Sequence, residues 1–473
     1  MRAAALAILL SALLAGPASA QVATGRIETL RPDQQRFRAL YEELVETDTT
    51  LSAGDCTRAA EQLAARLRAA GIAEGNVHVL TVPEHPKEGS LVAVYPGTSS
   101  SARPILLLGH IDVVEANRVD WERDPFTLVE ENGYFYARGS ADDKAMSAVW
   151  ADLLIRFAEE GYRPQRTVKL ALTCGEESDL AFNGADWLAR NRRELIDAEF
   201  ALNEGGGGET DGDGHLVVQT IQVGEKIYQD YVLSVSNPGG HSSIPAPDNA
   251  IYRMAAALSK IGAHEFPLQF NDTTRAMFAQ AKVLRPGEVG EAAARLAADP
   301  GDTAAEAIVN RDRWLHALLR TTCVATMVDG GHAKNALPQR VEANVNCRIF
   351  PGGTPAEVQA TLADIIGDET IAIRPARSDK PLALSPALDP AIVGPMERLS
   401  HRYFPGVPVI PAMSTGATDG LYLSAVGIPT YGVAGIWGDP DGNGAHGLNE
   451  RMEVRSLFVG RDYLYDLVKD YAG

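Results

Sequence analysis

Short apolar runs that end in acidic residues or histidine recur along this chain. The run at 105–109 leads into His110, and the run at 168–173 leads into Glu176 and Glu177. Runs of this length and composition are typical of strands that are buried on both faces of a sheet. Strands that alternate with helical segments favour a largely parallel sheet covered by helices on both faces. We therefore predict an α/β fold with polar residues gathered at the carboxyl ends of its strands.

The polar residues that follow these runs are of the types that bind zinc. Zinc accepts imidazole nitrogen and carboxylate oxygen, and two zinc ions can hold both reacting oxygen atoms of a hydrolysis. We expect each ion to receive one histidine and one glutamate, with an aspartate as the bridge. Three carboxylates balance the charge of two zinc ions and one hydroxide, which favours two metals over one. The predicted ligands are His110, Asp142, Glu177, Glu204 and His446.

Two further acidic residues are predicted to assist these ligands. Asp112 follows His110 by two residues, so on an extended chain both side chains point to the same face. This spacing suits a carboxylate that orients a ligand imidazole. Glu176 is expected to take a proton from the water activated by the metals and to pass it to the leaving nitrogen.

Each of these signals has an ordinary explanation when it is taken alone. A His-x-Asp triplet is common, and adjacent glutamates often lie in a solvated loop. Glu204 before a run of glycines suits a turn, and His446 in a Gly/Asp loop suits a surface histidine. The recurrence of the pattern, rather than any single residue, favours a metal site.

Ten short motifs extend the pattern from residue 109 to residue 447. In order they are GHIDVV (109–114), DWERDPF (120–126), ARGSADDK (137–144), TCGEES (173–178), LNEGGG (202–207), GGHSS (239–243), GGHAKNALP (330–338), NCRIFPGG (346–353), TGATDG (415–420) and GAHG (444–447). Together they resemble the M-twenty peptidase family, which includes aminoacylases, carboxypeptidase S, glutamate carboxypeptidase and several dipeptidases. Ala145, in place of a usual glycine, and Glu115-Ala116, in place of a common proline, depart from the family pattern.

The resemblance implies the same metal ligands, with Asp142 as the bridge, and adds residues from elsewhere in the chain. It implies that His241 reaches across a dimer to help polarise the scissile carbonyl. It also implies that Asn335 and Arg348 hold the substrate, because an arginine fork can bond both oxygens of a carboxylate. The alternatives are a loop-capping role for His241 and a surface ion pair for Arg348.

The segment before Asp419 is expected to lead into a helix. Free backbone N–H groups at such a helix start can hold an anion, whereas ordinary N-capping would use these residues equally well. In the family this loop lies beside the substrate carboxylate. Thr418 is therefore a secondary candidate for substrate binding.

The order of the patterns predicts a catalytic domain that is interrupted by an insertion. Residues 21–225 and 382–473 are expected to form the metal-bearing domain, and residues 226–381 an inserted α+β domain that serves as lid and dimer contact. Alternating strands are expected at 230–236 and 323–350. Residues 270–322 exceed the family's minimal lid, and no function is predicted for them.

The first twenty residues have the pattern of a signal peptide. A positive start is followed by an apolar run that is too short to span a bilayer, and then by small residues suited to cleavage after Ala20. We expect an exported protein, periplasmic or secreted, with no membrane segment after cleavage. The alternative is an uncleaved anchor.

The four cysteines allow several interpretations. Cys323 and Cys347 would face each other across a hairpin, where a disulfide and a pair of buried thiols are both reasonable. An oxidising compartment permits disulfides but does not require them. Cys174 is interpreted as a small core residue at a strand end.

Composition is consistent with a hydrolase of small molecules. The net charge of −19 argues against a nucleic-acid partner. We predict a di-zinc hydrolase, with cobalt or manganese as substitutes, that cleaves an amide or peptide bond beside a free carboxylate and forms a homodimer. An exported carboxypeptidase or dipeptidase is the first interpretation and an N-acyl-amino-acid amidohydrolase the alternative. A metal-free binding protein on the same fold is a third.

Overall fold

The computed structural model describes residues 29–178, 182–376, 381–382, 384–433 and 435–473. The predicted signal peptide at 1–20 lies outside these residues. Among the helices in the described ranges, none is both long enough and apolar enough to cross a membrane.

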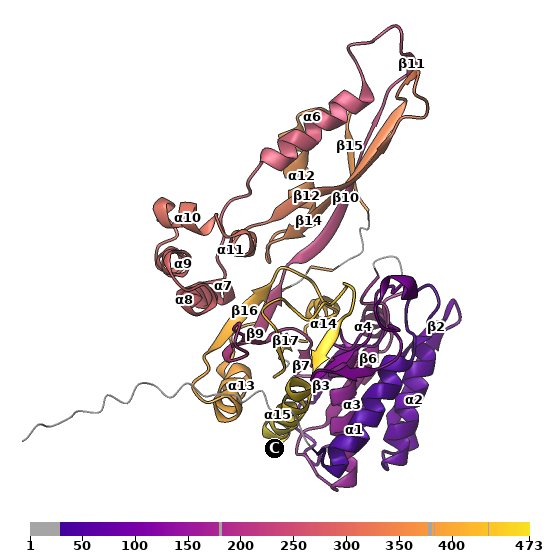
Figure 1. Ribbon diagram of the computed structural model, residues 1–473, viewed down its shortest axis with the longest axis vertical. Coiled ribbons are helices and arrows are strands. Elements are labelled where there is room, and N and C mark those ends of the chain that lie inside the picture. Colours follow the sequence, from indigo (N-terminus) through magenta and orange to yellow (C-terminus); the bar gives the residue numbers. More distant parts are fainter. Residues whose placement is uncertain (1–28, 179–181, 377–380, 383, 434) are drawn as a thin grey trace, which may run out of the picture.

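A ten-stranded sheet forms the base of the molecule (Figure 1). Its order is β1-β2-β6-β3-β7-β17-β9-β8-β18, with β16 paired to β9, and the central strands β6, β3, β7 and β17 are parallel. The strands are β1 (Val77–Val82), β2 (His85–Tyr95), β3 (Ile105–His110), β6 (Val168–Thr173), β7 (Phe200–Asn203), β8 (Gly207–Thr210), β9 (Leu216–Glu225), β16 (Val409–Ser414), β17 (Thr430–Gly432) and β18 (Trp437–Gly438). The predicted α/β class is confirmed.

Helices cover both faces of this sheet because the side chains of its buried strands alternate. In β3, Ile105 and Leu107 pack into one core, and Leu106 and Leu108 pack into the other. The first core contains α1 (Pro32–Glu46), α2 (Cys56–Ala69), α3 (Lys144–Glu159), α13 (Pro390–Tyr403) and α15 (Val454–Ala472). The second contains α4 (Gly184–Asn191), α5 (Arg193–Ile196) and α14 (Gly420–Ala425). A small sheet of β4 (Val129–Glu131), β5 (Tyr134–Tyr136) and β19 (Arg451–Glu453) and the 3-10 turns η1 (Glu74–Asn76) and η2 (Arg118–Asp120) complete this part.

The insertion extends away from the large sheet as a second layer of strands and helices (Figure 1). Its antiparallel sheet has the order β12-β14-β10-β15, and α6 and α12 pack against it. The elements are β10 (Ile227–Ser236), β12 (Thr322–Gly330), β14 (Arg340–Ile349), β15 (Ala372–Pro375), α6 (Ala250–Ala263) and α12 (Pro355–Ile366). The strands predicted at 230–236 and 323–350 are confirmed, except that residues 331–339 interrupt the second stretch and contain only a two-residue strand.

A pair of two-residue strands, β11 (Gly240–His241) and β13 (Ala336–Leu337), lies at the outer tip of the insertion. Residues 270–322 instead form a group of short helices next to the large sheet. These are α7 (Asp272–Ala279), α8 (Ala281–Leu284), α9 (Glu288–Ala298), α10 (Thr303–Val309) and α11 (Arg313–Leu318). Phe278 and Leu296 of this group share one core with Ile410 and Met413 of β16. The stretch that exceeds a minimal lid is thus packed onto the catalytic sheet.

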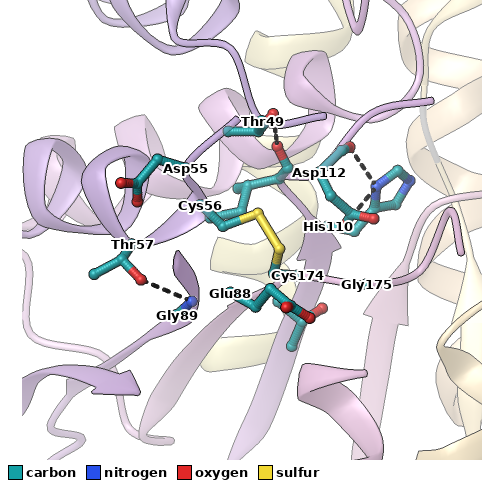
Figure 2. The surroundings of a disulfide bond; sticks show 12 residues. Thr49, Asp55, Cys56, Thr57, Glu88, Gly89, His110, Asp112, Cys174 and Gly175 are labelled. Atoms are coloured by element: carbon teal, nitrogen blue, oxygen red, sulfur yellow. Dashed lines mark hydrogen bonds and ion pairs between the residues drawn. A yellow bond between two sulfur atoms is a disulfide. The ribbon is translucent and has the colours of Figure 1, made fainter. Parts of the chain in front are cut away.

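Two disulfides connect the four cysteines. Cys323 and Cys347 occupy directly opposed positions of β12 and β14 and are bonded, which decides between the two alternatives left open above. Cys174 is a buried core residue directly after β6, as interpreted, and it is also bonded to Cys56 at the start of α2 (Figure 2), a bond that the sequence analysis did not predict. The two residues are 118 positions apart in sequence, so no local pattern could pair them.

Candidate metal centre

The five predicted metal ligands lie together at one edge of the large sheet. His110 ends β3, Glu177 follows β6 and Glu204 follows β7, and these three strands run parallel. Parallel strands present their carboxyl ends at the same edge, so the three side chains converge. Asp142 reaches the same point from the loop before α3, and His446 from the loop before β19.

Asp142 divides the cluster into two halves. Its Oδ1 lies 3.2 Å from Nε2 of His110, and its Oδ2 lies 3.2 Å from Nε2 of His446. Glu204 adds a carboxylate oxygen 3.8 Å from His110 Nε2, and Glu177 adds one 2.9 Å from His446 Nε2. Each half thus offers one imidazole, one glutamate and one oxygen of the shared aspartate.

The electrostatics of the cluster fit a pair of divalent cations. Hydrogen bonds with Asp142 and Glu177 raise the pKa of His446 to about 10. Burial lowers the pKa of His110, but the charge of Glu204 and nearby carboxylate bonds raise it well above its usual value. Among the described residues, the ion-pair partners of these ligand carboxylates are the two imidazoles. Such excess negative charge, on ligand types that zinc prefers, is what two bound zinc ions would neutralise.

Glu176 lies in the same cluster without belonging to either half. A carboxylate oxygen of Glu176 lies within 4.8 Å of ligand atoms of His110 and Glu204. Burial, followed by the charge of Glu204, raises the pKa of the Glu176 carboxyl well above its usual value. A carboxyl group with a raised pKa beside the reacting atoms is suited to accept a proton and return it.

Asp112 supports ligands of both halves. His110 Nδ1 donates a hydrogen bond to the backbone carbonyl of Asp112 at 3.1 Å, and the Asp112 carboxylate lies 3.6 Å from the same nitrogen. The other carboxylate oxygen accepts a hydrogen bond from the backbone N–H of Glu177 at 3.0 Å. The spacing from His110 predicted the approach of the carboxylate to the imidazole, but neither the bond to the backbone carbonyl nor the bond from Glu177.

Glu450 is a supporting residue that the sequence analysis missed. It is fully buried, and its carboxylate accepts hydrogen bonds from the backbone N–H groups of Gly139 and Asp142 and from the Arg138 guanidinium. It therefore connects the loop of the bridging aspartate to the loop that carries His446. An acidic residue only four positions after the predicted ligand His446 was the available signal.

Comparison with known proteins agrees with this geometry. Residues 106–470 match the model of Peptidase family M20/M25/M40. The chain belongs to this family. It is thus a hydrolase of a metallopeptidase family, and the resemblance described in the sequence analysis is confirmed.

The relatives and the solved structures agree on this family. The human "N-fatty-acyl-amino acid synthase/hydrolase PM20D1" is 28% identical over 81% of this chain and 77% of its own length. "Probable carboxypeptidase S-like 2" of Dictyostelium discoideum is 25% identical over 80% of this chain and 74% of its own. The fold matches that of an M20 family metallo-carboxypeptidase from Sulfolobus solfataricus with a TM-score of 0.71, at 19% identity, over 94% and 100% of the two chains.

Two of the residues implied by the family lie far from the cluster of their own chain. His241 in β11 and Asn335 just before β13 are exposed at the outer tip of the insertion (Figure 1). The backbone N–H of Ser242 donates to the carbonyl of Asn335 at 3.0 Å, which keeps the two segments together. One chain therefore does not bring these two family positions to the metal ligands.

Arg348 lies at the other end of the insertion, next to the cluster. It lines a cavity of about 280 Å³ together with Glu176, Glu177 and His446. Its guanidinium carbon lies 4.4 Å from the centre of the Tyr228 ring, which holds the side chain by stacking.

Thr418 lines the same cavity, but its hydroxyl is fully used within the protein. It donates to Glu225 at 2.9 Å and accepts from Asn203 at 3.0 Å and from the backbone N–H of Gly420 at 3.1 Å. The helix that follows, α14, has only six residues. Asp419 is the N-cap residue of this helix and its side chain makes no capping bond, whereas the Thr418 hydroxyl bonds the first helical N–H, that of Gly420.

Proposed function

We propose that this protein is a di-zinc hydrolase that cleaves an amide bond next to a free carboxylate. The observation that carries the proposal is the placement of Asp142 between two histidines, directly beside a cavity lined by Arg348. His110, Asp142 and Glu204 would hold one ion. His446, Glu177 and the second oxygen of the aspartate would hold the other.

Each group of the site would have a separate role in hydrolysis. When bound, the zinc pair would polarise the scissile carbonyl and lower the pKa of the attacking water. Glu176 accepts the proton of that water and delivers it to the leaving nitrogen. Arg348 pairs with the carboxylate of the substrate and so places the adjacent amide at the cluster.

Peptides and N-acyl amino acids both contain an amide beside a free carboxylate, and the ligands alone do not separate them. The name of the human relative specifies N-fatty-acyl amino acids, and that of the Dictyostelium relative specifies a carboxypeptidase. We place the N-acyl amino acids first, because a largely apolar cavity adjoins the cluster. The carboxypeptidase or dipeptidase function is the second candidate.

We further propose a homodimer formed through the inserted domain. Strand β12 lies at an edge of its sheet and exposes apolar side chains, with Val324 at 58%, Met327 at 72% and Val328 at 65% exposure. Such an edge readily pairs with a second strand. In a dimer, His241 would serve the partner's cluster. Its Nδ1 accepts a bond from the backbone N–H of Ser243 at 3.2 Å, so a neutral ring carries its proton on Nε2 and can donate it to a carbonyl oxygen.

Export is also part of the proposal. Two disulfides persist best in an oxidising compartment, and residues 1–20 have the pattern of a signal peptide. Release of the mature chain into the periplasm or medium by a host expressing the full sequence, with a new N-terminus at Gln21, would support export. Retention of the unprocessed chain in the membrane would contradict it.

The test of the function is a substrate panel on the zinc-reconstituted protein. Dipeptides, N-acyl amino acids and the matching N-acyl amino-acid amides would be compared by release of the free amino acid or amide. We expect hydrolysis of substrates with a free carboxylate and little of the amides, because Arg348 recognises the charge. Two bound metals with no hydrolysis of either class would contradict the proposed substrates, and no bound metal with no hydrolysis would favour the metal-free binding protein instead.

A further inference from the structure

A second cavity, of about 630 Å³, meets the metal cluster from another side. It shares Glu177 and His446 with the Arg348 cavity, so the two cavities join at the metal ligands. From there it extends between the 49–54 loop and residues 84–88, where the chain enters β2. Its volume is in the range of pockets that enclose small organic ligands.

The side chains that face this cavity provide a largely apolar wall. Aliphatic residues of three separate segments and the Cys56–Cys174 disulfide line it. They are Leu51, Pro86, Val113, Val114, Cys56 and Cys174. Figure 2 shows the disulfide near Asp112 and His110, and both its cysteines and Asp112 line the cavity.

Glu115 and Glu88, two acidic residues of the lining, are already engaged by the protein itself. Both carboxylate oxygens of Glu115 accept hydrogen bonds from Ser52, one from its backbone N–H at 2.9 Å and one from its hydroxyl at 2.8 Å. Glu88 bonds the His85 ring at 2.9 Å and accepts from the backbone N–H of Phe182 at 3.1 Å. These acidic groups therefore contribute little that would select a charged or polar ligand group.

The disulfide fixes the wall of the cavity in place. Cys56 is the first residue of α2, and Cys174 follows β6 directly and precedes Glu176 by two residues. The hydroxyl of Thr49 donates to the carbonyl of Ile111 at 2.7 Å, which attaches the 49–54 loop to the segment after β3 (Figure 2). The start of α2 and this loop are thus held against the strand ends that carry the site.

We propose that this cavity is the acyl-chain subsite of the enzyme and that the Cys56–Cys174 disulfide sets its shape. The ligand class is an unbranched apolar acyl group of an N-acyl amino acid. Its carboxylate would lie with Arg348 and its amide at the cluster, so the chain would enter the second cavity. The proposal rests on the proposed function and specifies which acyl groups that function selects.

The first test is a chain-length series on the zinc-loaded protein, from N-acetyl- to N-hexanoyl- to N-decanoyl-leucine. Each buried methylene should raise kcat/KM about fourfold until the cavity is filled, for a total of at least about 100-fold. Leu51→Trp places a large ring in the lining and should lower the decanoyl-to-acetyl ratio at least tenfold. The matched control is Val119→Trp, at a position 86% exposed and outside the cavity lining, and it should leave the ratio unchanged.

The double variant Cys56→Ala/Cys174→Ala tests the disulfide separately. It should lower the same ratio, because the wall is no longer held, and the ratio cancels any loss common to both substrates. A wild-type ratio near one would overturn the subsite. An unchanged ratio in the cysteine variant, together with a lowered ratio in Leu51→Trp, would remove the disulfide from the proposal.

A binding measurement separates this proposal from the proposed function. Calorimetric titration of the zinc-loaded Glu176→Gln protein with the same N-acyl leucines gives Kd without turnover. Affinity that tightens with chain length, and that does so less when Leu51→Trp is added, supports the subsite even if the wild-type protein hydrolyses none of the compounds. Affinity independent of chain length overturns the subsite even if hydrolysis is observed.

Discussion

The metal cluster and the tip of the inserted domain both carry predicted site residues, but within one chain the first set lies together and the second lies far from it. In the cluster, Asp142 lies 3.2 Å from both His110 and His446. At the tip, His241 and Asn335 are exposed and lie at the far end of the insertion from the large sheet (Figure 1). A single chain thus brings its predicted metal ligands together and holds two of the positions implied by the family away from them.

The difference shows how the side chains of each region are held in position. Cluster residues stand at the ends of parallel strands and are held by buried carboxylates, Asp112 and Glu450. His241 stands on a two-residue strand paired only with another of the same length. A variant that lacks a preorganised group of the cluster should lose activity in its own chain. A residue that a partner subunit supplies can instead be provided by a different, intact partner.

Removal of the bridging aspartate should have the largest effect. Asp142→Ala takes one ligand from each half of the cluster, so we expect both metals to be bound weakly and kcat/KM to fall by at least about 10⁴-fold. Elemental analysis after gel filtration and amino-acid release measure the two effects. Glu369→Ala, at an exposed acidic residue outside the candidate metal-holding groups of the described residues, is the control and should keep both metals. Full zinc occupancy in Asp142→Ala would contradict the bridging role.

The adjacent glutamates should separate metal binding from proton transfer. Glu176→Gln should keep two metals and lose about 10² to 10⁴ in kcat, because the amide cannot accept the proton. Glu177→Gln should lose metal from the His446 half, since its oxygen lies 2.9 Å from that imidazole. Metal content and kcat of the two variants are measured in parallel. Wild-type turnover by Glu176→Gln would remove it from the mechanism.

The sequence predicted the cluster well because local order and parallel topology place strand-end residues together. His110, Glu177 and Glu204 each follow an apolar run, and the parallel strands β3, β6 and β7 bring them to one edge. Contacts that depend on tertiary packing were not predictable in this way. The Cys56–Cys174 bond joins the start of a helix to a strand end 118 residues later, and Glu450 acts on a loop more than 300 residues earlier.

The fold class was predictable for the same reason, but the short helices within the insertion were less predictable. Alternation of apolar residues indicated the strands of the insertion, but Pro300-Gly301 and the capping residues Asp302 and Asp312 divide 289–319 into three short helices. Their packing onto β16, more than ninety residues later, follows from an apolar face that sequence alone cannot assign to a partner.

An intact His241 on a partner chain should restore activity to a chain that lacks it. His241→Ala should keep both metals and lose about 10² to 10³ in kcat, the usual cost of one donor to a developing oxyanion. Co-expression with Asp142→Ala should restore about a quarter of wild-type activity, because mixed dimers then combine one intact cluster with one intact tip. Amino-acid release by the purified mixture is the measurement. No gain over the separate variants would reject the cross-subunit role.

Disruption of the exposed edge strand β12 should lower kcat as His241→Ala does, but by a smaller factor. Met327→Asp places a charge on β12, where the native side chain is 72% exposed, and should shift the protein toward monomer. We expect metal content to be unchanged and kcat to fall by tens of fold at low protein concentration, with recovery as concentration rises. Light scattering and activity across a dilution series measure this. Val119→Asp is the exposed control, and a Met327→Asp dimer with full activity would place the interface elsewhere.

Arg348 belongs to the inserted domain but lies at the end next to the cluster. We therefore expect it to serve the cluster of its own chain, unlike the residues at the tip. Arg348→Lys keeps the charge and loses the planar fork, and we expect KM to rise about tenfold with kcat little changed. Arg348→Ala should have a larger effect on KM. Co-expression of Arg348→Ala with Asp142→Ala should give no rescue, because the chain with an intact cluster then lacks its own arginine. Rescue equal to that of His241→Ala would mean that the whole insertion, and not only its tip, serves the partner subunit.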